Sequence, residues 1–170
     1  RGRGAPMRPI GQDSRVTSRV DTSMTPGEIN DYLTLARTII LTTIGPDGVP
    51  DPVGMWFVLR DDEVWMRTYG SSQKALNVIR DPRVAVLIES GEQYAQLCGL
   101  QLTGTVDVVR DEDVICEIAA DLLVKYEGLA PEHVAAARAA YRAKAPKQVA
   151  LKLQPTKIVS WDHRKLMAAQ

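Results

Sequence analysis

The sequence predicts a mainly β fold, classed as α+β, in which six short antiparallel strands form a small barrel with helices at its periphery. β-branched or alternating segments recur along the chain and are separated by turn residues. No strand–helix–strand alternation of the kind that builds a parallel sheet is present. The 170 residues are enough for one domain with a sizeable core.

The first ordered element is expected at Thr25. Thr25 and Glu28 have capping-box spacing around Pro26, and apolar residues at helical spacing then extend a helix to about Arg37. Three strands of a meander follow. Their expected ranges are 38–44, 49–59 and 63–68. Because prolines at 50 and 52 cannot donate to a ladder, we expect the second strand to be bulged or to lie at an edge near its start.

The rest of the chain adds a short helix from the Gly70 loop to Arg80, two more strands, a helical pair and a strand-rich end. Either Asp111 or Asp113 caps the first helix of the pair, and Gly128 ends it. The remaining expected segments are strands 84–88 and 100–108, a helix from 131 to about 144, and strands 149–153 and 158–161, which Pro155 separates.

The N-terminal part carries no periodic pattern. We interpret residues 1–23 as a flexible arm and residues 24–170 as the barrel domain; an arm that docks across a partner subunit is the alternative. Residues 1–6 precede the first methionine, Met7, and we expect them to be an artificial extension.

The balance of charged residues argues against two classes of binding partner. Lys plus Arg equals Asp plus Glu at 21 each, which argues against nucleic acid and membrane surfaces as partners. No apolar run is long enough to span a membrane and no secretory signal is recognisable, so we expect the cytoplasm. Cys98 and Cys116 lack metal-ligand spacing and are interpreted as buried, reduced thiols.

No catalytic set is evident in the residues. Dinucleotide-binding, Walker and zinc-protease motifs are absent, and the two histidines, His133 and His163, are far apart in sequence, so no metal site is predicted. If the protein is an enzyme, a cofactor is expected to supply the chemistry.

One segment, residues 66–77, predicts an anion site. A strand ends in Arg67 and Thr68, a loop with Ser71 and Ser72 follows, and the next helix has Lys74 in its first turn. Helix N-termini attract anions, and lysine is unfavourable there unless an anion offsets it. Simple capping by a serine with a solvated lysine is the alternative.

The preceding irregular strand, 51–57, lies next to this segment. Gly54 would let a flat ring approach the backbone closely. By alternation, one of Trp56 and Phe57 must face the core.

These motifs together resemble the pyridoxamine 5'-phosphate oxidase-like split β-barrel superfamily, and in particular its flavin/deazaflavin (F420) oxidoreductase B group. The residues that carry the resemblance are Gly45-x-Asp47-Gly48-x-Pro50, Met55-Trp56-Phe57, Ser72-Gln73-Lys74-Ala75-x-Asn77, Arg80-Asp81-Pro82-Arg83-Val84, Gly91-Glu92-x-Tyr94, Gly104-Thr105-Val106 and Ser160 to Lys165.

The resemblance implies an FMN-binding split barrel that forms a homodimer, with cofactor sites at the subunit interface. The ring would lie along Val53, Gly54, Met55 and Trp56. The phosphate would meet Arg67, Thr68, Ser71, Ser72, Gln73 and Lys74, with Asn77 nearby. Residues near Tyr94 and Trp161 would come from, or close over, the partner side.

The same resemblance favours coenzyme F420 over FMN as cofactor and implies hydride transfer to a flat, conjugated small molecule. Scattered basic residues such as Arg60, Arg80 and Arg83 would meet the acidic tail of F420. Met55, Trp56, Leu97 and Leu100 are the candidate apolar lining. The catalytic residues stay open, since Tyr69, Tyr94 and solvent are all candidate proton donors. A non-catalytic carrier of a flavin, deazaflavin or haem-like ligand is the alternative from another class, and an FMN oxidase acting on pyridoxamine phosphate ranks last.

Overall fold

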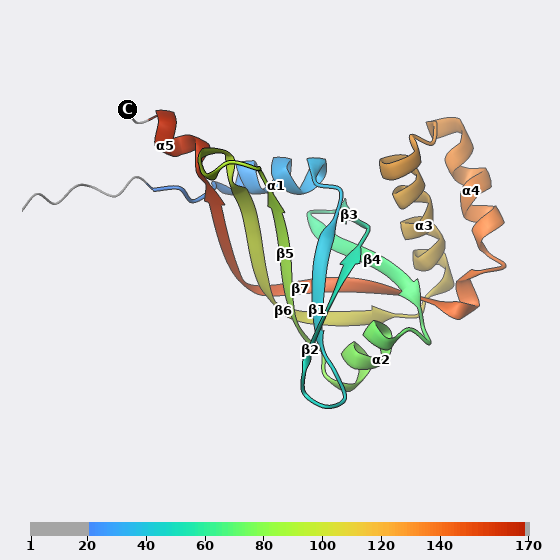
Figure 1. Cartoon of the computed structure of the whole chain (residues 1–170). Coiled ribbons are helices and arrows are strands. Elements are labelled where there is room, and N and C mark those ends of the chain that lie inside the picture. Colours follow the sequence, from blue (N-terminus) through green and yellow to red (C-terminus); the bar gives the residue numbers. More distant parts are fainter. Residues whose placement is uncertain (1–20, 169–170) are drawn as a thin grey trace, which may run out of the picture.

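The computed structural model describes residues 21–168, which form a seven-stranded antiparallel sheet with helices around it (Figure 1). The strand order is β2-β1-β5-β6-β7-β4-β3. The strands are β1 (Ile39–Ile44), β2 (Pro50–Met55), β3 (Phe57–Arg60), β4 (Glu63–Tyr69), β5 (Arg83–Ser90), β6 (Cys98–Val109) and β7 (Gln148–Asp162). The α-helices are α1 (Pro26–Leu35), α2 (Gln73–Arg80), α3 (Glu112–Glu127), α4 (Val134–Tyr141) and α5 (Arg164–Ala168), and single 3-10 turns are η1 (Tyr94–Gln96), η2 (Pro131–His133) and η3 (Ala145–Lys147).

The sheet curls because its two edge strands are neighbours in sequence. β2 and β3 stand at opposite ends of the strand order, yet only Trp56 separates them in the chain. The expectation of one strand over residues 49–59 was therefore wrong. Trp56 leaves the ladder and the chain passes from one edge of the sheet to the other. The sheet has seven strands, whereas a six-stranded barrel was expected. The prolines at 50 and 52 lie on edge strand β2, as expected.

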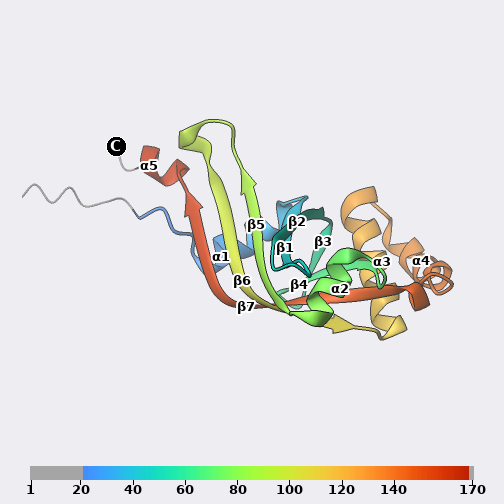
Figure 2. The ribbon, with the colours of Figure 1, turned by 60° about the horizontal axis from the view of Figure 1, so that its bottom comes forward.

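Near the C-terminus, the two strands expected at 149–153 and 158–161 form a single strand, β7. β7 runs without a break past Pro155, which lies opposite Gly104 at a register shift in the β6–β7 ladder. A Cβ at Gly104 would overlap the carbonyl oxygen of Gln154, so glycine lets the two backbones approach at this bulge. β5, β6 and β7 bend here and extend well beyond the barrel (Figure 2).

The main core fills the inside of the barrel. Phe57, Leu41, Met66 and Leu100 are fully buried there, and Phe57 is thus the core-facing member of the Trp56–Phe57 pair. The helix α1 covers one end of this core. Its predicted capping box is confirmed, with Glu28 N donating to Thr25 Oγ1 and Thr25 N donating to Glu28 Oε2.

A second core lies outside the barrel, between α3, β3 and β7, and includes Ile115, Ile118 and Ala150. Asp111 caps α3 and Gly128, with a φ of 68°, ends it. The ends of α1 and α3 also cap each other. Lys125 Nζ donates to Leu33 O at 3.3 Å, and Arg37 Nη1 donates to Lys125 O at 2.6 Å.

The described chain contacts the sheet already before residue 24. Thr22 O accepts a hydrogen bond from Asp162 N, so residues 21–23 lie alongside β7. The rest of the expected arm, residues 1–20, lies outside the described residues. Both cysteines are buried and free, as expected. No helix within residues 21–168 is long and apolar enough to cross a membrane.

Candidate functional site

The start of α2 is a fixed loop with unused backbone donors. Ser72 caps the helix, its Oγ accepting from Ala75 N at 3.4 Å, and Gly70 N donates to Lys147 O at 3.0 Å. The first N–H groups of a helix have no partner within it. Those of Gln73 and Lys74 take part in none of the hydrogen bonds found in the described chain. They are therefore available, with the positive end of the helix dipole, to an anion.

Three polar side chains surround these donors. Thr68 Oγ1 lies 3.1 Å from Ser72 Oγ, which brings the end of β4 to the start of α2. Lys74 is half-buried and forms no ion pair within residues 21–168. A lysine in a first helical turn opposes the dipole, so an anion bound here would offset both charges.

Asn77 ties this helix to the barrel. It is fully buried, and its Nδ2 donates to Thr43 Oγ1 at 2.9 Å and to Asp51 Oδ2 at 3.1 Å. Its Oδ1 accepts from Gln73 Nε2 at 2.8 Å. The side-chain amides of Asn77 and Gln73 therefore already have hydrogen-bond partners within the chain. Asn77 holds α2 against β1 and β2.

The outward face of β2 is open at Gly54. A Cβ at this position would meet only Thr38 Cγ2 at 3.7 Å and Ile40 Cδ1 at 4.0 Å, which is ordinary contact. The fold itself therefore does not require glycine here. Val53 packs against the core and Met55 is buried in it, so these two residues offer only backbone to the outer face.

Trp56, by contrast, is 51% exposed. Its ring is stacked on that of Tyr126, with centroids 4.4 Å apart and planes 8° from parallel. Tyr126 comes from the end of α3, and sequence reasoning missed it. No local signal marks this tyrosine, because its contact with Trp56 joins segments far apart in the chain.

Arg67 turns away from the other predicted phosphate residues. Its Nη1 donates to Gln148 Oε1 at 2.9 Å and to Tyr141 Oη, and the guanidinium lies over the Tyr141 ring. Successive residues of a strand face opposite sides, so Arg67 and Thr68 cannot both reach one ligand with their side chains from β4. The pattern of residue types had placed both at the phosphate.

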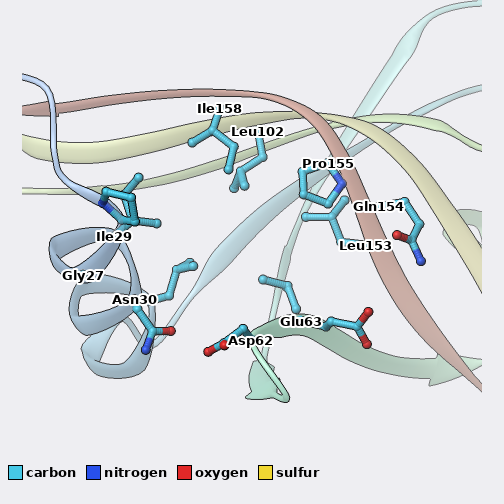
Figure 3. Close-up of a pocket in the computed structure, with 13 residues that line it drawn as sticks. Gly27, Ile29, Asn30, Asp62, Glu63, Leu102, Leu153, Gln154, Pro155 and Ile158 are labelled. Carbon is cyan, nitrogen blue, oxygen red and sulfur yellow. The ribbon is translucent and has the colours of Figure 1, made fainter.

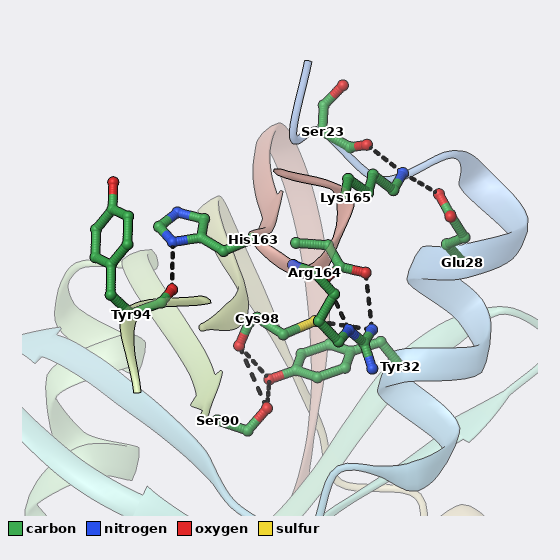
Figure 4. Close-up of polar contacts among 10 residues, drawn as sticks. Ser23, Glu28, Tyr32, Ser90, Tyr94, Cys98, His163, Arg164 and Lys165 are labelled. Carbon is green, nitrogen blue, oxygen red and sulfur yellow. Dashed lines mark hydrogen bonds and ion pairs between the residues drawn. The ribbon is translucent and has the colours of Figure 1, made fainter. Parts of the chain in front are cut away.

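Tyr94 lies at the far end of the molecule from α2. It is 73% exposed in the turn between β5 and β6, where its ring packs against His163 and its carbonyl oxygen lies 2.8 Å from His163 Nδ1 (Figure 4). Figure 2 shows this turn and α2 at opposite ends of the long strands. Within one chain, Tyr94 cannot join the other predicted site residues.

The arginines expected to meet an acidic tail are all engaged within the chain. Arg60 pairs with Glu117, Arg83 pairs with Asp81 at 2.6 Å, and Arg80 donates to Ile44 O. Of the expected apolar lining, Met55 and Leu100 are core residues, which leaves Trp56 as the large exposed member.

The candidate site lies on the open face of β2 and at the start of α2. A cavity of about 520 Å³ is found elsewhere, between α1, the β3–β4 turn and β7 (Figure 3). Its walls are mostly apolar, including Leu33, Leu102 and Leu153, with Asp62 at the rim.

The outer face of the sheet next to Gly54 carries an exposed apolar row. The register places Ile40 beside Leu87, and Gln101 between Leu87 and Val159. Ile40, Leu87 and Val159 are each exposed by 36 to 42%. An apolar row of this kind, continuous with the open face of β2, is typical of a surface that another protein covers.

Comparison with known proteins gives a family. Residues 25–162 match the family described as pyridoxamine 5'-phosphate oxidase. A crystal structure of the conserved hypothetical protein Rv2991 from Mycobacterium tuberculosis is 35% identical, with a TM-score of 0.79 over 88% of this chain and 91% of that one. No sequence among the curated proteins matches.

Two further solved structures share the fold. One is named as an F420 reductase, with 22% identity and a TM-score of 0.59 over 76% of this chain and 94% of that one. The other is HutZ, described as a haem storage protein from Vibrio cholerae, with 18% identity and a TM-score of 0.61 over 80% of this chain and 94% of that one. At these identities the likeness concerns the fold alone.

Proposed function

We propose that this chain, which belongs to the pyridoxamine 5'-phosphate oxidase family, is an oxidoreductase that binds coenzyme F420 at the start of α2 and along β2. It would act as a homodimer and reduce a planar, conjugated small molecule. The observation that carries the proposal is Lys74, which forms no ion pair within residues 21–168 and lies at the first N–H groups of α2, together with the open backbone at Gly54.

Each part of this site fits one part of a flavin-type cofactor. Lys74, the hydroxyls of Ser72 and Thr68, and the N–H groups of the first turn of α2 would hold the phosphate. The backbone of β2 at Gly54 would carry the ring, because the position has no side chain to keep a flat molecule away. Asn77 fixes the distance between these two parts, since it bonds α2 to β1 and β2.

The chain's own contribution to the chemistry is orientation and exclusion of water. When bound, a reduced deazaflavin supplies the hydride. The protein would hold the acceptor on the open face of the bound ring, and Trp56 is the exposed aromatic side chain nearest in sequence to Gly54.

A homodimer is supported by two observations. The apolar row of Ile40, Leu87 and Val159 adjoins the site and is uncovered in the single chain. The turn that carries Tyr94 lies at the opposite end of the long strands from α2 (Figure 2), so a tyrosine of this turn would reach the proposed site only from a second copy. Both features are explained if the copy covers the row and delivers its Tyr94.

The preference for F420 over FMN rests on the resemblance of the sequence to the F420 oxidoreductase B group. Arg67 and Arg80, which could have held an FMN phosphate, bond to groups of the chain itself. The fold shared with a protein named as an F420 reductase is consistent with this choice.

The test is titration of the purified, cofactor-free protein with F420 and with FMN, followed by quenching of cofactor fluorescence. We expect micromolar binding of F420 and weaker binding of FMN. Lys74→Ala removes a charged hydrogen-bond donor and should weaken F420 binding roughly tenfold to a hundredfold. The matched control is Lys157→Ala, an exposed lysine of β7 away from α2, which should bind as the wild type does.

The other outcomes are equally informative. Tighter binding of FMN than of F420 would overturn the cofactor choice. Equal binding by Lys74→Ala and wild type would overturn the site. F420 binding without turnover of any quinone or activated alkene would make the protein a carrier instead of an enzyme.

A further inference from the structure

The link between β2 and β3 lacks the support that a sheet normally gives. Trp56 pairs with no strand, and Phe57 is the first residue of β3. The hydroxyl of Tyr126 takes over part of this role, because it accepts from Phe57 N at 3.0 Å and donates to Phe57 O at 3.1 Å. One side chain of α3 thus holds the backbone at the link between edge strands β2 and β3.

The same tyrosine fixes the plane of the Trp56 ring. The two rings are nearly parallel at 4.4 Å, and the guanidinium of Arg37 lies 5.0 Å from the centre of the Tyr126 ring. With its hydroxyl bonded and its ring flanked, Tyr126 cannot turn without breaking several contacts. The orientation of Trp56 is therefore set by α3.

The core does not explain why a tryptophan is exposed here. Phe57 already fills the core position and is fully buried, while about half of Trp56 faces solvent. Gly54 and Trp56 are both exposed on either side of the buried Met55, and two residues of extended chain span at most about 7 Å. An indole held at that distance stands beside the place where a flat ring would meet the backbone.

From this geometry we infer that Trp56 is an aromatic wall which selects planar, conjugated acceptors, and that Tyr126 is the positioning residue that holds the wall. The inference deepens the proposed function and rests on it, since the acceptor is taken to be the molecule that receives the hydride. Parallel stacking is favourable for a planar ring and unavailable to a puckered one, which gives the wall its selectivity.

The first measurement is direct binding of menadione, a planar naphthoquinone, to the full chain by equilibrium dialysis. Cyclohexenone, a small puckered enone, is the comparison ligand. We expect Trp56→Leu to weaken menadione binding roughly threefold to tenfold and to leave cyclohexenone binding unchanged. The matched control is Trp65→Leu, a half-buried tryptophan on β4 that lies over Lys152; it should bind menadione as the wild type does.

The second measurement separates the two contacts of Tyr126. Tyr126→Phe keeps the stacked ring and loses the hydrogen bonds, whereas Tyr126→Leu loses both. We expect menadione binding, and the quenching of tryptophan emission that accompanies it, to fall more in Tyr126→Leu than in Tyr126→Phe. A general loss of stability would instead weaken both ligands together, which thermal unfolding of each variant would reveal.

These experiments stand apart from the test of cofactor binding. If the protein binds neither F420 nor FMN but menadione binding depends on Trp56 and Tyr126, the proposed function fails and the wall remains. If F420 binds and Tyr126→Leu keeps the wild-type preference for menadione over cyclohexenone, the inference about the wall is overturned and the proposed function is not.

Discussion

The two ends of the long strands differ in whether their charged side chains have partners within the chain. Near α5, each notable side chain has a partner in the same chain: Asp162 accepts from Arg164 Nε at 2.7 Å, and Lys165 pairs with Glu28 at 2.8 Å (Figure 4). Near α2, Lys74 has no ion-pair partner within residues 21–168.

Glycines show the same contrast. A Cβ at Gly99, which pairs with Trp161 near α5, would overlap the ring of Trp161 and lie 2.9 Å from Ile88 O. The fold therefore demands glycine at this position. At Gly54 a Cβ would fit. The comparison teaches that the α5 end is explained by folding, whereas the α2 end contains residues that the fold does not need.

The largest expected effect is that of Gly104→Ala. The new Cβ would meet the backbone of Gln154 and Pro155, and backbone cannot move aside as a flexible side chain can. We expect a loss of about 1 to 3 kcal/mol in the free energy of unfolding. Urea denaturation measures it, and a variant as stable as the wild type would show that the bulge is not fixed by this glycine.

The next effect is that of Asp162→Asn at the α5 end. Hydrogen bonds from Arg164 lower the pKa of Asp162. Folding is therefore favoured above the ordinary carboxyl pKa, and this gain is lost as the pH falls through the folded-state value. Because Arg164 is exposed to water, we expect a loss of only about 0.5 to 1 kcal/mol at neutral pH. The gap between variant and wild type should close under strong acid; a constant gap would contradict the ion pair.

A smaller effect is expected with alkaline pH at Lys125. Burial, and then the neighbouring Arg37, lower the pKa of Lys125 to about 8. Above that pH the folded chain has released a proton that the unfolded chain still holds, so stability should rise with pH relative to Lys125→Met. The readout is the urea midpoint between about pH 8 and 9.5, below the range in which tyrosines ionise. If the urea midpoints of the wild type and Lys125→Met changed with pH in the same way, the lowered pKa of Lys125 would be refuted.

The smallest effect on stability is expected for Gly54→Ala. This variant tests most directly whether the α2 end contains a glycine that the ligand needs and the fold does not. We expect the free energy of unfolding to stay within about 0.5 kcal/mol of the wild type, because the Cβ meets no close neighbour. Binding of F420 should nevertheless weaken severalfold, since the methyl group would keep the ring from the backbone. Unchanged binding in the titration would remove Gly54 from the site.

Local signals in the sequence predicted the ends of helices well. Thr25 and Gly128 act as predicted, Asp111 is the cap of the two candidates Asp111 and Asp113, and Ser72 is one of the two serines considered as a cap in the alternative interpretation. Capping is decided by a few adjacent residues. The strand count failed where the deciding contact is distant. Nothing near Trp56 shows that β2 and β3 belong to opposite edges, and nothing near Pro155 shows that Gly104 accommodates it across the ladder.

The same difference between local and distant contacts explains why only part of the candidate site could be predicted. The segment from Thr68 to Lys74 is contiguous, so its residues lie together as expected. The direction of Arg67 depends on Tyr141 and Gln148, and the orientation of Trp56 depends on Tyr126. These partners belong to the helical pair or to the strand after it, and only the folded chain brings them to the barrel.

The single-residue link between β2 and β3 has a consequence for folding. The β1–β2 and β3–β4 hairpins are local and can form early, whereas pairing of β4 with β7 joins distant parts of the chain and is expected later. Until that pairing is complete, the two hairpins are hinged at Trp56 and the ring of strands is open. A molecule stacked on Trp56 would therefore bind only the closed ring, and its affinity would report how completely the barrel has assembled.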